Sequence, residues 1–270
     1  MRRARSVAAA DPRRDGDSQA ALFAQRAFAP GSAKVTLGTG SSVLLNVGDG
    51  ARPSRSGIVT TVAWVHDERP TFAFEGIINC TGSTVAWLKD QLGLLRSPEE
   101  SEQLATSVAD NGGVYLVPAF VGLGAPHWRQ DARAAILGLT PHSTRAHVAR
   151  AALEAIAYQI RDVLDAMAVA AGRPLVELSA DGGMVTNAFL MQFIADVARV
   201  GVRASAVPEL SALGAALAGM LGAGSSARSP TWSASTSACD ATHRPCRPIG
   251  SMRCTRAGGG PGQTLHRGEP

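Results

Sequence analysis

Aromatic residues make up only 5% of this 270-residue chain, cysteines number four, and no hydrophobic run is long enough to cross a membrane. Cys80 stands alone in the middle of the sequence, and Cys239, Cys246 and Cys254 follow near its end without a CxxC spacing. This pattern favours neither a zinc site nor a disulfide framework. We therefore expect a protein of a reducing, cytoplasmic compartment that does not span a membrane.

Positive charge is in modest excess and gathers at the two ends of the chain. The formal net charge is +4, and arginines crowd residues 2–14 and 244–267. Nucleic-acid-binding surfaces interleave basic residues with stacking aromatics on a folded element. Few aromatics accompany these arginines, so the composition argues against a nucleic-acid partner. A hydrophobic content of 45% is enough for the core of a soluble globular protein.

Apolar residues recur with strand-like and helix-like periods in turn, which predicts an α/β fold. We expect strands near residues 35–37, 43–47, 58–64, 71–75 and 176–179, and a central, largely apolar strand at 114–120. Helices are expected near 85–92, 144–171, 187–200 and 212–223; the last is rich in Gly and Ala, as a buried helix would be. Glu154 and Gln159, on the long second helix, are expected to be exposed.

The tripeptide Gly38-Thr39-Gly40 separates two of the expected strands, so the segment predicts a strand, a tight turn and a strand. Glycines on both sides of a hydroxyl residue allow positive φ and let backbone N–H groups approach a bulky anion. An ordinary hairpin tip has the same composition. The tripeptide alone therefore leaves both a phosphate-binding turn and a plain turn open.

Two further motifs place polar groups beside expected helices. Asp17 stands where a helix should begin, and an Asp there is most often an N-cap. Gly182-Gly183 follows an expected strand and precedes the helix that begins near Asn187. Glycines at such a junction leave room for a nucleotide next to the free N–H groups of a helix N-terminus. A plain strand-to-helix connection fits this pattern as well.

In this order, the motifs resemble the C-terminal half of the FGGY family of carbohydrate kinases, and its glycerol kinases in particular. The resemblance begins with GDSQAALF at residues 16–23 and the Gly38-Thr39-Gly40 turn. It continues through blocks at residues 74–76, 81–90, 117–128, 131–140, 152–159, 181–187 and 212–216. Several blocks in order are far more specific than any one of them.

The resemblance implies the ribonuclease H-like fold of the actin, sugar kinase and Hsp70-type ATPases, a mixed sheet flanked by helices. The family's C-terminal domain would then span residues 16–223. Residues 1–15 do not match and are expected to be a disordered start. Residues 224–270 are rich in Ser, Arg and Pro, and are expected to be a disordered or frame-shifted tail.

The family's chemistry, phosphoryl transfer from ATP with Mg²⁺, implies a role for each matched position. Asp17 corresponds to the general base on the substrate hydroxyl. Ser18 occupies a substrate-contacting position at which glycerol kinases often carry glutamine. Thr39, supported by Gly38 and Gly40, corresponds to the residue beside the transferred phosphate. The positions that line the nucleotide correspond to Gly82, Gly183 and Asn187. No residue is assigned as a metal ligand.

The function implied is that of a glycerol kinase, which converts ATP and glycerol to ADP and glycerol 3-phosphate. The family's N-terminal half, with most of the polyol pocket, has no counterpart in this sequence. We therefore expect the chain to be inactive unless a complementary N-terminal half joins it; homo-oligomers are also common in the family. Another FGGY polyol or sugar kinase, and a non-catalytic nucleotide-binding fragment, are the alternatives.

Overall fold

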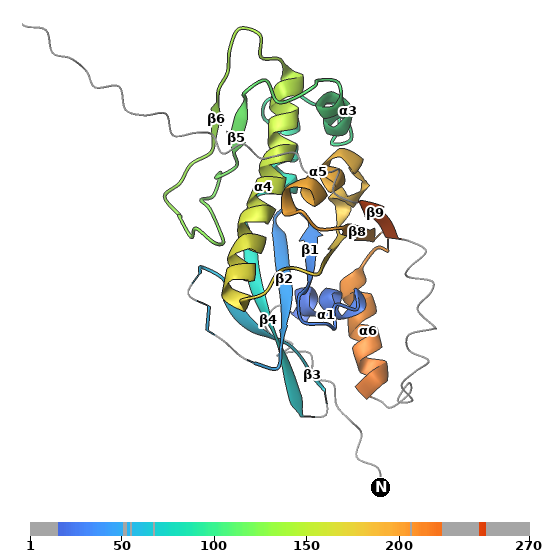
Figure 1. Cartoon of the computed structure of the whole chain (residues 1–270). Helices are drawn as coiled ribbons and strands as arrows, with labels where there is room; N and C mark the ends of the chain where they lie inside the picture. The colour runs from blue at the N-terminus through green and yellow to red at the C-terminus, as the bar shows by residue number, and fades with distance from the viewer. Residues whose placement is uncertain are drawn as a thin grey trace, which may run out of the picture.

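The computed structural model describes residues 16–50, 53–54, 56–66, 68–205, 207–222 and 243–246. Its centre is a seven-stranded mixed sheet (Figure 1). In sheet order the strands are β3 (Val59–His66), β4 (Arg69–Ile78), β2 (Ser41–Gly48), β1 (Ser32–Leu37), β7 (Glu177–Asp181), β8 (Val202–Ser205) and β9 (His243–Cys246). β1, β7 and β8 run parallel, and every other neighbouring pair is antiparallel.

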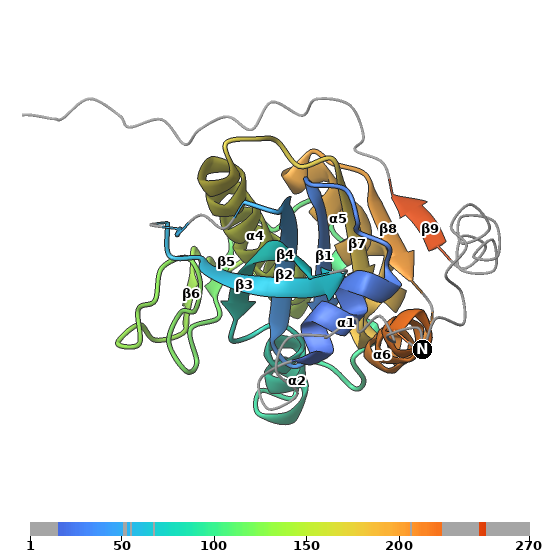
Figure 2. The ribbon, with the colours of Figure 1, turned by 90° about the horizontal axis from the view of Figure 1, so that it is seen from below.

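Helices cover both faces of this sheet (Figure 2). α4 (Arg145–Ala171) and α5 (Ala188–Ala198) lie on one face, and α1 (Gly16–Ala24) and α6 (Leu210–Gly222) lie on the other. Side chains alternate along β1, so Val35 and Leu37 join the main core under α4 and α5. Lys34 and Thr36 consequently face the α1 side. The expected mixed sheet flanked by helices is confirmed.

α4 is the long helix that the sequence predicts. Thr144, in extended conformation, precedes its first residue, and Gly172 ends it with a φ of 63°, a value that glycine adopts readily. Ile156, Ile160, Val163 and Met167 recur at helical spacing and are fully buried. Burial of this stripe against the sheet stabilises the helix far more than its intrinsic propensity does.

The expectation of exposed polar residues on α4 is wrong. Glu154 is 4% exposed, and its carboxylate accepts hydrogen bonds from Arg150 Nε and from Asn111 Nδ2, each at 2.8 Å. Gln159 is half-buried and donates to the carbonyl of Cys80 at 3.2 Å. α3 (Glu100–Thr106) and the loop after it cover this face of α4, and such long-range covering leaves no periodic signal in the sequence.

The expected central strand at 114–120 is also wrong. Residues Tyr115–Val117 form β5, which pairs only with β6 (Ala135–Leu137) in a separate two-stranded sheet. Pro118 follows at once, and proline cannot donate a hydrogen bond to a ladder. The short pair exposes Tyr115 and Leu137, by 52% and 56%, so it is not a buried strand.

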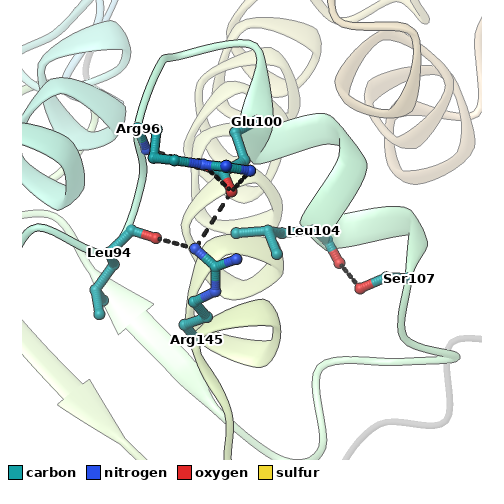
Figure 3. Close-up of polar contacts among 6 residues, drawn as sticks. All are labelled: Leu94, Arg96, Glu100, Leu104, Ser107 and Arg145. Atoms are coloured by element: carbon teal, nitrogen blue, oxygen red, sulfur yellow. Dashed lines mark hydrogen bonds and ion pairs between the residues drawn. The ribbon is translucent and has the colours of Figure 1, made fainter.

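A buried carboxylate anchors α3 to the start of α4 (Figure 3). The Glu100 side chain is 7% exposed and accepts from the backbone N–H of Arg96 at 2.6 Å, while Arg145 Nη1 lies 3.2 Å from its Oε1. The hydrogen bond from the Arg96 backbone is the largest cause that lowers the pKa of Glu100. The next residue, Ser101, lies 3.4 Å from Asn187 Nδ2, so this anchor supports a predicted site residue.

Glu100→Gln should destabilise the fold at neutral pH and lose that effect in acid. The folded-state pKa lies below 4.5, so the ionised carboxylate adds stability above the unfolded-state pKa. This stability disappears as the pH falls through the lowered folded-state pKa. Melting temperatures of variant and parent should therefore converge between pH 7 and pH 3. Glu102→Gln, in the same first turn, is the control; a Glu100→Gln difference that is constant with pH would contradict the assignment.

Helix α6, near the end of the chain, forms as expected but is not the buried helix that its composition predicts. α6 buries Leu210, Gly214 and Ala218 but exposes 49% of Met220, so it is a surface helix and not a buried one. No helix within the described ranges is both long and apolar enough to cross a membrane. Residues 1–15 and most of 224–270 lie outside the described residues, apart from β9, which pairs with β8.

Candidate functional site

The GTG turn (residues 38–40) joins β1 to β2 and packs on the start of α2 (Gly82–Asp90). The N–H of Gly82 donates to the carbonyl of Gly38 at 2.9 Å, and the N–H of Thr81 donates to the carbonyl of Thr39 at 3.0 Å. The Thr81 hydroxyl donates to the Gly38 carbonyl as well, at 2.9 Å. Helix α2 thus uses its otherwise unpaired N-terminal donors to hold the turn.

These hydrogen bonds determine where the N–H groups of the GTG turn point. In a trans peptide the C=O of one residue and the N–H of the next point in opposite directions. Because the carbonyls of Gly38 and Thr39 face α2, the N–H groups of Thr39 and Gly40 face away from it. Gly38 and Thr39 are exposed. The accessible side of the turn therefore presents two backbone donors beside a hydroxyl, a set that suits an anion.

Close backbone contacts join the GTG turn, and Leu37 directly before it, to two other glycine positions. A β-carbon at Gly82 would lie 2.6 Å from the Gly38 carbonyl oxygen and 3.4 Å from Met184 Sδ. A β-carbon at Gly182 would lie 2.5 Å from the carbonyl oxygen of Leu37, and its φ is +95°. Only glycine fits these two places without displacing the neighbouring backbone. Three glycine segments that are distant in sequence thus meet at one edge of the sheet.

A cavity of about 680 Å³ opens beside this junction, a volume in the range of small-molecule sites. Its walls come from the ends of β1 and β7, from η1 (Gly183–Thr186), from the start of α5, and from the segment that joins β8 to α6. Gly183 lines it, and a β-carbon there would meet no atom within 4 Å. The loop after β7 therefore leaves space toward the cavity.

The predicted nucleotide residues divide into two groups. Gly183 lines the cavity, whereas Thr39, Gly82 and Asn187 lie outside its wall. Asn187 is the N-cap of α5, and its Oδ1 accepts from the N–H of Leu190 at 2.9 Å. Because this cap already uses the side-chain oxygen, the structure assigns Asn187 a supporting position. A contact between Asn187 and a nucleotide stays a prediction.

The predicted base lies at the start of α1. Asp17 is exposed in the first turn of this helix. The hydroxyl of Ser18 donates to Ser42 Oγ at 3.1 Å, and the hydroxyl of Ser42 donates to Glu75 Oε1 at 3.3 Å. Ser42 stands two residues after the GTG turn, so these contacts bring the start of α1 to the same end of the sheet. The roles of Asp17 and Ser18 stay predictions.

A layer of buried polar side chains lies between α1 and the sheet. Lys34 is fully buried, and its Nζ donates to Thr36 Oγ1 at 2.7 Å. Thr36 pairs with Asp181 across β1 and β7, and Asp181 Oδ2 accepts from Gln25 Nε2 at 2.5 Å. Burial lowers the pKa of Lys34, and the nearby carboxylates oppose this effect, Asp181 most of all. Thr36 and Asp181 also line the cavity.

Sequence reasoning missed this polar layer. A lysine between the apolar residues of a strand is unusual, because a lysine is almost never fully buried without partners. Lys34 could therefore have indicated the polar layer. Asp181 could have indicated it too, since it directly precedes Gly182. Gln25 could not, because its hydrogen-bond partner lies 156 residues away in the sequence.

The layered sheet with glycine loops at one edge defines the class of protein, a ribonuclease H-like ATPase domain of the type found in actin, Hsp70 and sugar kinases. A xylulose kinase from Lactobacillus acidophilus matches with a TM-score of 0.73 and 19% identity, over 86% of this chain and 46% of that chain. This is a likeness of fold. A glycerol kinase from Plasmodium falciparum, solved with ADP, matches with a TM-score of 0.73 and 38% identity, over 76% of this chain and 41% of that chain.

The family follows from the sequence profile of the C-terminal domain of FGGY carbohydrate kinases, which matches residues 33–223. The chain belongs to the FGGY family of carbohydrate kinases. A glycerol kinase from Methylorubrum populi is 55% identical over 210 residues, or 77% of this chain. Glycerol kinase 1 from Thermotoga maritima is 50% identical over 206 residues, or 76% of it. The chain spans about 42% of the length of these relatives.

Proposed function

We propose that this chain is the nucleotide-binding domain of a glycerol kinase, which transfers the γ-phosphoryl group of ATP to a hydroxyl of glycerol. The observation that carries the proposal is the junction of the GTG turn with Gly82 and Gly182 beside a cavity of nucleotide size. Identities of 50% and 55% to glycerol kinases support glycerol as the acceptor. The products are ADP and glycerol 3-phosphate.

In this proposal the residues of the chain orient the reactants and stabilise charge. The N–H groups of Thr39 and Gly40 donate to the terminal phosphates, whose charge is the main obstacle to transfer. The cavity beside Gly183 receives the nucleoside. Asp17 accepts the proton of the substrate hydroxyl as its oxygen bonds to phosphorus. The bond from phosphorus to the ADP oxygen breaks in the same transfer.

We propose that Mg²⁺ binds together with ATP. Among the described residues no group of three or more His, Cys, Asp or Glu side chains is arranged to hold a metal ion. Mg²⁺ in kinases is bound through one or two carboxylates together with substrate phosphates and waters. No carboxylate of the described residues is assigned to the ion here, because Asp17 is given the role of base. The ion would bind the phosphates and neutralise their charge.

Gly183→Ala should weaken ADP binding without weakening the fold. The added methyl group meets no atom within 4 Å in the free chain, so we expect the free energy of unfolding to change by less than about 0.5 kcal/mol. A nucleotide in the cavity would meet the methyl group, and its affinity should fall roughly tenfold, or about 1.4 kcal/mol. Calorimetric titration with ADP and thermal unfolding measure the two effects.

Gly219→Ala is the matched control for this test. Gly219 lies in α6, away from the cavity, and a β-carbon there also meets no atom within 4 Å. This variant should bind ADP as the parent does. Equal ADP affinity for the parent and Gly183→Ala would show that the nucleotide does not lie against this loop.

A second candidate function is that of an FGGY kinase acting on another polyol or sugar. The hydrogen-bonded chain from Ser18 through Ser42 to Glu75 favours it, because it sets two small hydroxyl side chains near Asp17. Glycerol kinases often carry a larger glutamine at the Ser18 position. Comparing kcat/KM for glycerol, erythritol and xylitol, in a complex of the chain with a complementary N-terminal half, decides between the two. Preference for a longer polyol would favour the second function.

The reaction also needs the remainder of a kinase, since the chain matches only about 42% of its relatives' length. We propose that a complementary N-terminal half supplies most of the polyol pocket, and that the isolated chain binds nucleotide without turning over glycerol. ATP and glycerol are cytoplasmic metabolites, so we propose the cytoplasm as its location. Assembly into homo-oligomers is a further proposal, drawn from the family resemblance alone.

A further inference from the structure

Helix α1, which carries Asp17, is connected to the cavity at two points remote from Asp17 itself. The first is the side chain of Gln25, directly after the last residue of the helix. Gln25 is 5% exposed and Asp181 is 4% exposed, and their hydrogen bond of 2.5 Å joins α1 to the cavity wall. A hydrogen bond to a carboxylate in a buried setting is among the stronger ones.

The second connection runs through α6. Leu210 and Ser211, in the first turn of α6, line the cavity. One turn later the α6 backbone touches α1, since a β-carbon at Gly214 would lie 1.8 Å from the carbonyl oxygen of Ala20. α6 is the element most extensively packed against α1. The cavity wall and the helix of the predicted base are thus in backbone contact.

The Gln25–Asp181 pair has little freedom to relax. Lys34 is fully buried nearby, and the Asp181 carboxylate raises the pKa of Lys34 against the lowering effect of burial. The next residue, Gly182, lies against the Leu37 backbone, which limits any shift of the strand end. Separating the pair would leave a buried carboxylate with one partner fewer, at a large cost. A displacement of Asp181 is therefore transmitted to Gln25.

We infer that Gln25 and Asp181 form a positioning pair, through which a nucleotide in the cavity orders α1 and so sets the place of Asp17. The inference rests on the proposed nucleotide site and adds a function for two residues that touch no reacting atom. A nucleotide against Asp181 and Leu210 restrains two supports of α1 at once. The nucleotide then favours an ordered α1, and by linkage an ordered α1 favours nucleotide binding.

Hydrogen exchange of the 270-residue chain, with and without saturating ADP and Mg²⁺, tests this inference. Amides of α1 should exchange about tenfold more slowly in the ADP-bound parent, a typical size for coupling between sites. Gln25→Leu keeps the volume but removes the donor, and the slowing should fall below about twofold. Calorimetry on the same samples verifies that ADP saturates each protein.

Gln19→Leu is the matched control. Gln19 is equally buried on the same helix, but its Nε2 donates to Thr61 on β3, away from the cavity. This variant should retain the full slowing by ADP even if it melts earlier. A swapped pair, Gln25→Glu with Asp181→Asn, restores an amide-to-carboxylate hydrogen bond and should recover the effect. The swap also provides a readout if Gln25→Leu does not fold.

Three results would overturn the inference. If bound ADP left the exchange rate of α1 amides unchanged in the parent, the nucleotide site and α1 would not be coupled. Full slowing in Gln25→Leu, equal to that in Gln19→Leu, would show that the pair does not carry it. Absence of ADP binding in calorimetry would contradict the proposed nucleotide site, and the inference would fall with it; that result is distinct from binding without protection.

Discussion

Asp17→Asn should reduce glycerol phosphorylation roughly a hundred- to ten-thousand-fold, the usual contribution of a general base, and leave ADP affinity largely unchanged. Asparagine keeps the shape of the side chain but cannot accept the proton of the substrate hydroxyl. Because Asp17 is exposed in the first turn of α1, the substitution should leave the fold intact. The rate is measured in a complex of the chain with the N-terminal half of a glycerol kinase.

The control for this prediction is Asp90→Asn. Asp90 is an exposed residue at the end of α2, paired with Lys89 at 2.7 Å, so its loss should leave both turnover and ADP binding unchanged. Turnover by Asp17→Asn at the parent's rate would refute the assignment of the base. Loss of ADP binding together with activity would instead assign Asp17 to the nucleotide site.

Gly214→Ala should strongly destabilise the fold. Its methyl group would lie 1.8 Å from the carbonyl oxygen of Ala20, so α1 and α6 must separate or unfold locally. Overpacking of this severity costs about 3 kcal/mol. Denaturant unfolding followed by circular dichroism should show a lower midpoint with an unchanged slope.

Gly219→Ala, five residues further along α6, serves as the comparison. Its methyl group meets no atom within 4 Å, and alanine is the better helix former, so this variant should gain about 0.5–1 kcal/mol. The two substitutions are chemically identical and should move the unfolding midpoint in opposite directions. A midpoint for Gly214→Ala at or above that of the parent would contradict the close contact between α1 and α6.

The parts of the fold that the sequence predicts well are those determined by near neighbours. The GTG turn appears between two strands because glycines allow the tight turn and apolar residues on each side form the strands. Helix α4 begins after Thr144 and ends at Gly172, because its cap residues and apolar stripe are all local signals. In both cases the local preference and the final packing agree.

The remaining parts depend on contacts between distant segments. Glu154 is buried because α3 and the following loop cover it, and no spacing along α4 reveals that covering. The segment at 114–120 has the composition of a central strand, but its three paired residues join β6 in a separate sheet. The hydrogen bond between Gln25 and Asp181 also depends on distant segments, since its two partners become neighbours only when the sheet forms.

In the candidate site, too, the sequence predicts the local features but not the contacts between distant segments. Glycine motifs predicted the GTG turn and the loop at Gly182-Gly183, and the family resemblance added Gly82. Close backbone approach requires a residue without a β-carbon. The sequence did not predict how they meet, with Gly82 against the Gly38 carbonyl and Gly182 against Leu37. Nor did it predict the buried Lys34 beneath them, whose neighbouring carboxylates Asp181 and Glu75 come from other strands.

Calorimetric titration of the 270-residue chain with ADP and Mg²⁺ tests the nucleotide site most directly. We predict saturable binding of one nucleotide per chain, with a higher melting temperature in its presence because the ligand binds only the folded state. No saturable heat and no shift in melting temperature, from a chain that unfolds cooperatively, would contradict the proposal that the three glycine segments form a nucleotide site.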